Sequence, residues 1–314
     1  MRGGVILAPM HPVLFHVGPL IVRWYGVMMG LALFLSIPIT AHFAARFGFG
    51  RAVVDAIAVP FLAILVIGAR AGYVVSHLSE FSGRPLAVVL PPYAGLASHG
   101  SIAAGLAFLA WWCPRHRIPV WRLLDAMAPA VLVSIVLVRW GNFMNGELLG
   151  DPTRLPWGVA VPDLPGGPRH PLPLYEIAGT LAILAGILAP SGVVRRRPFD
   201  GAVWWSAIIA SSVLRFLLDL LRSQDRTPVF LTLGQMAALV LIAWGAWFLW
   251  TGRRRAESAS SAALPQASSR RDAPASPPPG TSRRDAPASP PPGTSRRDAP
   301  ASPAGAAGST HIPR

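Results

Sequence analysis

The sequence contains few charged residues and a single cysteine. Only 13% of its 314 residues are charged, whereas a soluble domain carries about 25%. Hydrophobic residues make up 52%, and the mean hydropathy is +0.46. This composition excludes an ordinary soluble domain and predicts an all-α polytopic membrane protein.

Other absences narrow the chemistry. One cysteine, Cys113, excludes an intramolecular disulfide and a cysteine metal cluster, and we expect it to be an incidental thiol at a helix end. The sequence shows no metal-ligand spacing, no glycine-rich phosphate loop and no serine elbow. We therefore expect no metal and no cofactor.

The net charge of +14 does not indicate a nucleic-acid-binding protein. The arginines are scattered at the ends of apolar segments and in the C-terminal tail, and they do not gather into one basic face. Their distribution fits the orientation of membrane helices better. We therefore expect no nucleic-acid partner.

About seven apolar segments are long enough to cross a bilayer, with six or eight as alternatives. They lie near residues 19–43, 52–77, 100–113, 123–143, 174–192, 201–221 and 231–251. The segment before them is broken by prolines and does not read as a cleaved signal peptide.

The loops predict an orientation with the N-terminus outside and the C-terminus in the cytoplasm. The loops then assigned to the cytoplasm contain Arg46, Arg51, Arg115, Arg117, Arg122, Arg195, Arg196, Arg197, Arg253, Arg254 and Arg255. On the other side the arginines are sparser and mixed with acidic residues. This orientation puts residues 142–173 on the extracytoplasmic side.

The composition changes after Gly252 to Ser, Pro, Ala, Arg and Gly. A 13-residue unit, SRRDAPASPPPGT, starts at Ser269 and Ser282 and recurs in truncated form at Ser295. Having few large apolar residues to bury, residues 253–314 are expected to be a disordered basic tail after a membrane domain of residues 1–252. The tail could rest on anionic lipids or be a solvated extension.

Polar residues interrupt the apolar background in four places. Arg139, Asn142 and Gly146 would share one helix face if the helix continued, and Arg215, Asp219 and Arg222 would form a charged stripe. Buried charges are costly in a membrane and usually face a polar cavity or a substrate. An internal Arg215–Asp219 ion pair is the structural alternative.

The remaining two groups are weaker signals. His99 lies at a helix entry, where a capping or interfacial role is common, and residues 169–176 read RHPLPLYE at the start of another helix. Together the guanidinium, amide and imidazole groups favour an anionic substrate, such as a phospholipid reached from within the bilayer.

Several ordered motifs resemble those of the prolipoprotein diacylglyceryl transferases of bacterial inner membranes. The strongest is RWGNFMNGELLG at residues 139–150. The others are GPLIVRWYGVMMG from Gly18, GARAGYVVSH from Gly68, ASHGS from Ala97, PWGVAVP from Pro156, RHPLPLYE from Arg169 and LTLGQ from Leu231. The resemblance extends over most of the first 250 residues.

The resemblance implies transfer of diacylglycerol from phosphatidylglycerol to the lipobox cysteine of a prolipoprotein signal peptide. A thiol of pKa about 8.5 would lose its proton and displace a phosphate. The catalytic residues implied are His99, Arg139, Arg215 and Tyr25, with His99 as general base or positioning group. The substrate-binding residues implied are Arg139, Asn142, Asn145, Glu147, Gly150 and Asp219.

The chain departs from the family pattern at five positions. They are Ser101 and Val138 in place of glycine, Pro173 in place of glutamine, Ser211 in place of tyrosine and Asp219 in place of glutamate. These departures keep open a non-catalytic lipid-binding paralogue of the same fold. A secondary transporter is a weaker alternative, because the hydropathy of the two halves shows no internal repeat.

Overall fold

The protein is represented by a computed structural model that describes residues 11–18, 20–81, 83, 85–88, 95–160, 166–222 and 231–263. The long helices are α1 (Trp24–Arg46), α2 (Arg51–Ser76), α4 (Ser98–Arg115), α5 (Val120–Met144), α6 (Leu172–Leu188), α8 (Ala202–Asp219) and α9 (Leu233–Ala263). Short elements are strands β1 (Val13–Val17) and β2 (Leu20–Arg23) and helices α3 (Leu78–Phe81), η1 (Pro85–Val88) and α7 (Val193–Arg196).

The predicted helical membrane fold is confirmed. In the described residues, six helices are long and apolar enough to cross a bilayer, and α4 is a seventh long helix. Helix α4 lies outside that set because its 18 residues include Ser98, His99, Pro114 and Arg115. Most ends of the predicted segments lie within a few residues of the ends of the seven long helices.

A β-hairpin precedes the first long helix, which the expectation of an all-α fold did not include. Strands β1 and β2 pair antiparallel, with Val17 opposite Leu20 and His16 opposite Ile21. The turn contains Gly18 with a φ of +56°, which glycine adopts without a Cβ clash. The run LIVR is rich in β-branched residues, so the first helix begins at Trp24 and not near residue 19.

The last helix is longer than predicted. Helix α9 continues past Gly252 through the arginines to Ala263, so the disorder predicted for residues 253–263 does not hold. Arginine, alanine and glutamate are strong helix formers, and the Ser258 hydroxyl donates to the Arg254 carbonyl at 2.9 Å. The repeats from Ser269 lie outside the described residues.

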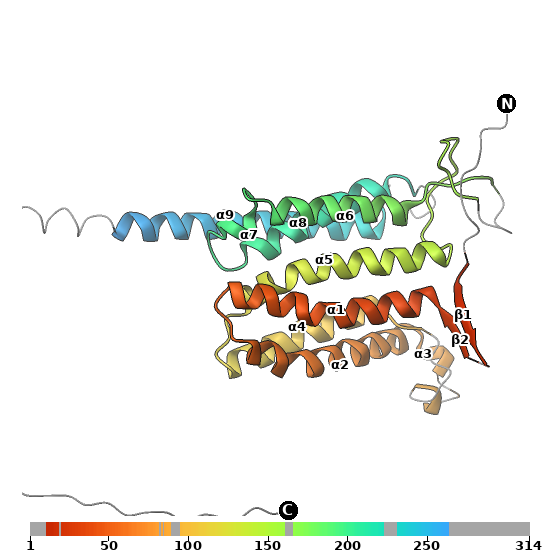
Figure 1. Cartoon of the computed structure of the whole chain (residues 1–314), viewed down its shortest axis with the longest axis horizontal. Helices are drawn as coiled ribbons and strands as arrows, with labels where there is room; N and C mark the ends of the chain where they lie inside the picture. Colours follow the sequence, from red (N-terminus) through yellow and green to blue (C-terminus); the bar gives the residue numbers. More distant parts are fainter. Residues whose placement is uncertain are drawn as a thin grey trace, which may run out of the picture. The chain divides into compact units, whose positions relative to one another are not determined.

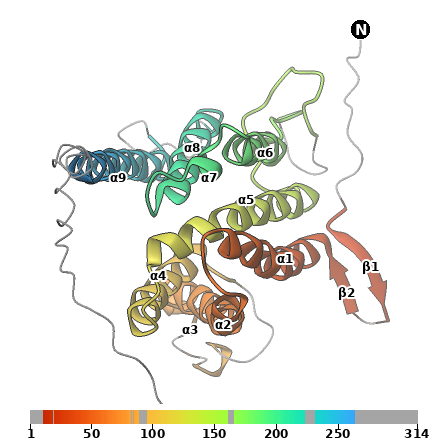
Figure 2. The ribbon, with the colours of Figure 1, turned by 60° about the vertical axis from the view of Figure 1, so that its left-hand side comes forward.

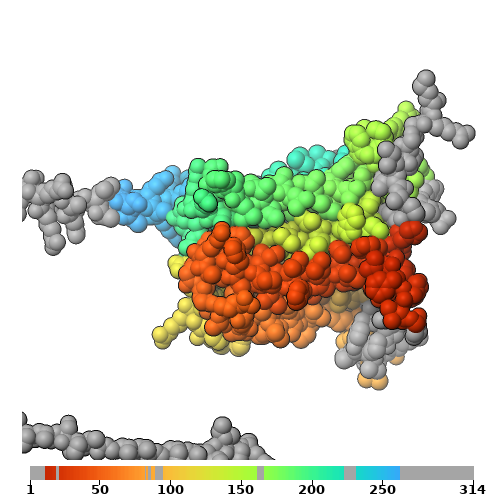
Figure 3. All heavy atoms as spheres, viewed as in Figure 1, coloured from red at the N-terminus to blue at the C-terminus, as the bar shows by residue number. Residues whose placement is uncertain are grey.

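Helix α5 is the central element (Figures 1 and 2). It lies between α1 on one side and α6 and α8 on the other, and Figure 3 shows its residues as a narrow strip between α1 and α6 on that face. Its buried side chains include Leu123, Leu124 and Leu132. Residues at the C-terminal end of α5 can therefore reach both halves of the bundle.

Two hydrogen bonds hold the N-terminal end of α8 against α5. The buried carboxylate of Asp125 on α5 accepts hydrogen bonds from the backbone N–H groups of Gly201 and Trp204 at 2.8 and 2.9 Å. These are N–H groups that the first turn of a helix leaves without partners. Asp125 therefore joins the start of α8 to the start of α5.

Helices α2 and α4 cross at glycines. A Cβ on Gly100 would lie 2.2 Å from the Gly68 carbonyl oxygen and 2.6 Å from the Gly72 Cα. Small residues of this kind let two membrane helices approach closely enough for backbone contact. The glycines of the GARAGY and SHG segments therefore fix the spacing between α2 and α4.

The arginine-rich loops share one end of the bundle. The α1–α2 and α4–α5 connections and α7 lie at the end where α9 finishes, while β1, β2 and α3 lie at the opposite end (Figure 1). We call the first the arginine-rich end and the second the hairpin end. The C-terminal end of α5 and the start of α9 belong to the hairpin end.

We expect Gly68→Ala to destabilise the protein. The added Cβ would lie 2.3 Å from the Ala104 Cβ and 2.7 Å from the Gly100 carbonyl oxygen, and such overpacking costs about 1–3 kcal/mol. Thermal unfolding in detergent measures this as a lower Tm. Gly186→Ala on α6 is the control, because its Cβ would meet no atom within 4 Å. Equal Tm values for both variants would show that the helix crossing tolerates a Cβ.

Candidate functional site

The segment RWGNFMNGE forms the end of α5 and a tight reversal. The Glu147 N–H donates to the Asn142 carbonyl at 3.0 Å, and the Gly146 N–H donates to the Phe143 carbonyl at 3.0 Å. With Gly146 at a φ of +72°, this is a Schellman motif. The helix ends at Met144, so the condition for a shared helix face is not met, and Gly146 does not lie on the helix face of Arg139 and Asn142.

The reversal brings the Glu147 carboxylate over the last turn of α5. It accepts hydrogen bonds from the side-chain amides of Asn142 at 2.8 Å and Asn145 at 3.1 Å. The Asn142 amide oxygen accepts in turn from Arg139 Nη1 at 3.0 Å. The signature residues thus orient the Arg139 guanidinium from one side.

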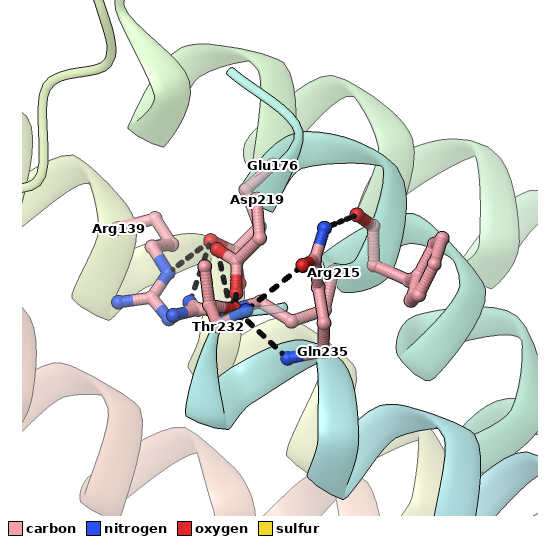
Figure 4. Close-up of polar contacts among 7 residues, drawn as sticks. Arg139, Glu176, Arg215, Asp219, Thr232 and Gln235 are labelled. Carbon is pink, nitrogen blue, oxygen red and sulfur yellow. Dashed lines mark hydrogen bonds and ion pairs between the residues drawn. The ribbon is translucent and has the colours of Figure 1, made fainter. Parts of the chain in front are cut away.

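Glu176 on α6 orients Arg139 from the other side. Its Oε2 lies 2.7 Å from Arg139 Nε and 3.9 Å from Arg215 Nη1 on α8 (Figure 4). The Glu176 side chain is 15% exposed, compared with 20% for Arg139 and 35% for Arg215. A single carboxylate therefore draws together guanidiniums from α5 and α8.

Asp219 forms the second acidic contact of Arg215. Arg215 Nε lies 3.2 Å from Asp219 Oδ1, so the intrahelical ion pair that the sequence left open as the structural alternative is present. The buried Asp219 carboxylate also accepts from the Thr232 hydroxyl at 3.1 Å. Arg222 lies just beyond the end of α8 and, with Glu176, Arg215 and Asp219, lines a small cavity.

A larger cavity of about 580 Å³ adjoins Arg139. Helices α1, α2 and α5 supply mainly aliphatic side chains to it, and Tyr25, Arg139 and Asn142 contribute polar groups. Gly141 lets α1 approach, since a Cβ there would lie 3.0 Å from the Tyr25 Cα. The cavity combines an apolar volume with guanidinium, amide and phenol groups, which suits an amphiphile with an anionic head.

His99 does not join this cluster. Its Nε2 lies 3.2 Å from the Ser76 hydroxyl, and among the described residues it has no hydrogen bond or ion pair with Arg139 or Arg215. Its neighbour Ser98 lines the large cavity. The Ser76 hydroxyl donates to the Gly72 carbonyl at 2.9 Å, so the tautomer of His99 with its proton on Nε2 would donate to Ser76 and leave Nδ1 unprotonated.

Gly150 packs closely against neighbouring segments in the structure, and the substrate-binding role expected for it stays a prediction. A Cβ there would lie 2.8 Å from the Leu221 carbonyl oxygen and 3.1 Å from the His170 Cβ. The Gly150 N–H donates to the His170 carbonyl at 2.9 Å, and Arg169 Nη1 donates to the Gly150 carbonyl at 3.2 Å. Gly150 therefore joins residues 169–170 to the end of α8.

The match to known proteins covers most of the chain. Residues 12–251 match the prolipoprotein diacylglyceryl transferase family. The chain belongs to this family. A phosphatidylglycerol–prolipoprotein diacylglyceryl transferase of Geobacter sulfurreducens is 36% identical over 68% of this chain and 83% of its own length. A protein of the same name from Symbiobacterium thermophilum is 34% identical over 82% of this chain and 99% of its own length. Another from Synechococcus elongatus is 32% identical over 74% of this chain and 84% of its own length.

The departures from the family pattern lie in different environments. Val138 lines the large cavity, and Pro173 is buried beside Glu176 and Arg215 at the start of α6. Ser211 lies one turn before Arg215 on α8, and Ser101 lies within α4. Asp219 keeps the ion pair to Arg215 despite its shorter side chain. The polar contacts around both arginines are therefore present in this member of the family.

Sequence reasoning did not select Glu176 as a site residue. An acidic residue in the first turns of a helix is common, because it interacts favourably with the helix dipole. The signal available was that Glu176 is the acidic residue of an otherwise apolar helix, α6. Thr232 and Gln235 belong to the LTLGQ motif and were not predicted as site residues. Their spacing of three residues is that of a capping box.

We expect the Arg139–Glu176 pair to be strongly coupled. Arg139→Leu or Glu176→Leu alone leaves one charge without its partner in a largely apolar setting, and such single changes cost about 3–5 kcal/mol. The double variant should unfold at a higher temperature than the sum of the single effects predicts. Thermal unfolding of all four proteins completes the double-mutant cycle. Additive effects would mean that the ion pair contributes nothing to stability.

Proposed function

We propose that the chain transfers the diacylglyceryl group of phosphatidylglycerol to the lipobox cysteine of prolipoproteins. Family membership supports this reaction. The single observation that carries it to this site is the convergence of Arg139 and Arg215 on Glu176, with Arg139 also lining an apolar cavity.

The reaction needs the phosphate to leave a glycerol carbon. The cysteine thiol loses its proton, the thiolate attacks the glycerol carbon to form a C–S bond, and the C–O bond to the phosphate breaks. The products are a thioether and glycerol phosphate. The departing phosphate gains negative charge, so guanidiniums aimed at it stabilise the transition state more than the ground state.

Arg139 and Arg215 are the groups we assign to that charge. The Arg215 Nη1 contact with Glu176 is long, at 3.9 Å, and its side chain is 35% exposed, so its Nη groups can reach a phosphate. Glu176 holds both guanidiniums near one point before substrate arrives, which lowers the cost of ordering them on binding. Asp219 aligns the Nε edge of Arg215.

The other site residues hold the head group and the acyl chains. Tyr25 and Asn142 line the same cavity as Arg139 and can donate hydrogen bonds to the lipid head group. Asn145 and Glu147 fix the Asn142 amide and act on the substrate through it. The aliphatic side chains of α1, α2 and α5 provide the surface for an acyl chain.

We assign His99 to the peptide side of the reaction, as the group that accepts the thiol proton. Its Nδ1 is the nitrogen available as a base, given the contact of Nε2 with Ser76. A neutral imidazole can take a proton from a thiol. This role requires the signal peptide to approach between α4 and the arginine pair.

We further propose that the hairpin end of the bundle faces the extracytoplasmic side. The arginine-rich loops would then lie in the cytoplasm, as the positive-inside rule expects, with the C-terminus there. The enzyme would be an integral protein of the bacterial inner membrane, and its partners would be phosphatidylglycerol and prolipoprotein signal peptides.

We expect Arg139→Ala to abolish transfer. The purified protein, given phosphatidylglycerol and a lipobox peptide in detergent, should form a thioether-linked product detectable by mass spectrometry. Loss of one guanidinium aimed at the leaving group should lower kcat by at least about 100-fold. Arg51→Ala is the control, since Arg51 lies at the start of α2 at the arginine-rich end and pairs with Asp55. Full turnover by Arg139→Ala would remove Arg139 from the mechanism.

The non-catalytic paralogue makes a different prediction for cells. Expression in a strain depleted of its own transferase should restore growth if the chain is an enzyme. Failure to rescue, with the protein present in the membrane at normal level, would favour a lipid-binding paralogue. The departures at Pro173 and Ser211, both close to Arg215, are the observation that gives this alternative weight.

We expect His99→Gln to lower kcat without changing the KM for phosphatidylglycerol. Glutamine keeps a donor for Ser76 but supplies no titratable base. If His99 accepts the thiol proton, the pH–rate profile of the variant should differ in shape from that of the wild type. An unchanged pH profile with a raised KM for the peptide would show that His99 only positions the substrate.

A further inference from the structure

The carboxylate of Asp219 is held by the start of α9 as well as by Arg215. Asp219 is 3% exposed, and its Oδ2 accepts from the Thr232 hydroxyl at 3.1 Å and from Arg215 Nε at 3.3 Å. Thr232 itself is 4% exposed. The rotamer of Asp219, and with it the direction of the Arg215 side chain, therefore depends on a residue 13 positions away in sequence.

Thr232 is fixed by a capping box at the start of α9. The Gln235 N–H donates to the Thr232 hydroxyl oxygen at 2.9 Å, and the Thr232 N–H donates to the Gln235 side-chain oxygen at 3.0 Å. This reciprocal pair is the S/T-x-x-E/Q capping arrangement. The hydroxyl oxygen thus accepts from Gln235, and its hydrogen is directed to Asp219 (Figure 4).

Gln235 also connects α9 to α8. It is 2% exposed, and its side-chain nitrogen donates to the Phe216 carbonyl at 3.4 Å, one residue after Arg215. Gly234 permits this close approach, because a Cβ there would lie 2.4 Å from Asp219 Oδ2 and 3.7 Å from Arg215 Nε. Residues 232–235 therefore contact both the backbone and the side chains of the last turns of α8, where Arg215 lies.

We propose that Thr232, held by Gln235, is a positioning residue for Arg215. The chain of contacts runs from the α9 capping box through Asp219 to the Nε edge of the guanidinium, and it leaves the Nη groups on the opposite edge directed toward Glu176 and the phosphate. The proposal rests on the proposed function, since it assigns Thr232 to the geometry of the leaving-group site.

A merely structural cap would behave differently. Removing a cap shortens or loosens the first turn of a helix and lowers stability, whatever the chemistry of the hydroxyl. A positioning role requires in addition the hydroxyl hydrogen that reaches Asp219. A hydrogen bond to a charged group is stronger than one between neutral groups, so its loss should be visible in the kinetics.

The test compares Thr232→Val with Thr232→Ser in the full-length protein. Valine keeps the shape and removes the hydroxyl, whereas serine keeps the hydroxyl and removes a methyl group. We expect Thr232→Val to lower kcat about tenfold, the effect of losing one charge-assisted hydrogen bond, with the KM for the lipobox peptide unchanged. Thr232→Ser should keep kcat within about twofold of the wild type.

Thr180→Val is the matched control. Thr180 is 2% exposed on α6, so the change removes another buried hydroxyl from a helix that also belongs to the bundle. It should leave kcat unchanged. Wild-type kinetics for Thr232→Val, or an equal loss in Thr232→Val and Thr232→Ser, would overturn the proposal, because packing and not the hydroxyl would then be responsible.

Lipid retention separates this proposal from the proposed function. Native mass spectrometry of the detergent-solubilised variants measures bound phosphatidylglycerol against bound phosphatidylethanolamine. We expect Arg215→Ala to lose the preference for the anionic lipid. Thr232→Val should reduce this preference as well, and Thr232→Ser should keep it. If the wild type forms no thioether product, the proposed function fails. In that case an unchanged lipid preference in Thr232→Val rejects the positioning role, and a reduced one supports it.

Discussion

The site depends on one carboxylate shared by two guanidiniums. Glu176 lies 2.7 Å from Arg139 Nε and 3.9 Å from Arg215 Nη1, and the three residues come from α6, α5 and α8. Two arginines brought together in an apolar bundle would repel one another, and the carboxylate offsets that repulsion. Because its distance to Glu176 is the longer, Arg215 is paired less tightly with this carboxylate than Arg139 is.

The cost of burying these charges explains the surrounding network. An unpaired charge inside a membrane helix costs about 2.5–3.5 kcal/mol on insertion scales. Here the Asn142 amide oxygen accepts from Arg139 and Glu147 holds the Asn142 amide. On the other side Asp219 pairs with Arg215 and accepts from the Thr232 hydroxyl. Because these partners come from the Schellman reversal after α5 and the capping box of α9, both ends of the site are formed by helix-terminal motifs.

The sequence predicted about seven helices and singled out several residues of the candidate site, because both leave local signals. Long apolar runs marked the helices, and Arg215 and Asp219 are four residues apart, so their pairing follows from helix geometry. The end of α5 at Met144 was predicted to within one residue, but the Schellman turn after it was not, because such a turn and a continuing helix share the same residues up to Gly146. The Glu176 bridge could not be predicted by spacing, since it depends on how α6 packs against α5. The hairpin was missed because a short apolar run fits a strand as well as a helix.

The position of the chain's only thiol has a practical consequence. Cys113 is 1% exposed and lies at the arginine-rich end of α4, at the other end of that helix from His99. A protein whose proposed substrate is itself a cysteine therefore presents no accessible thiol of its own, which protects it against self-lipidation. Maleimide or iodoacetamide added to the intact protein and peptide would report on the peptide alone, so unreacted substrate can be titrated without mutating the enzyme.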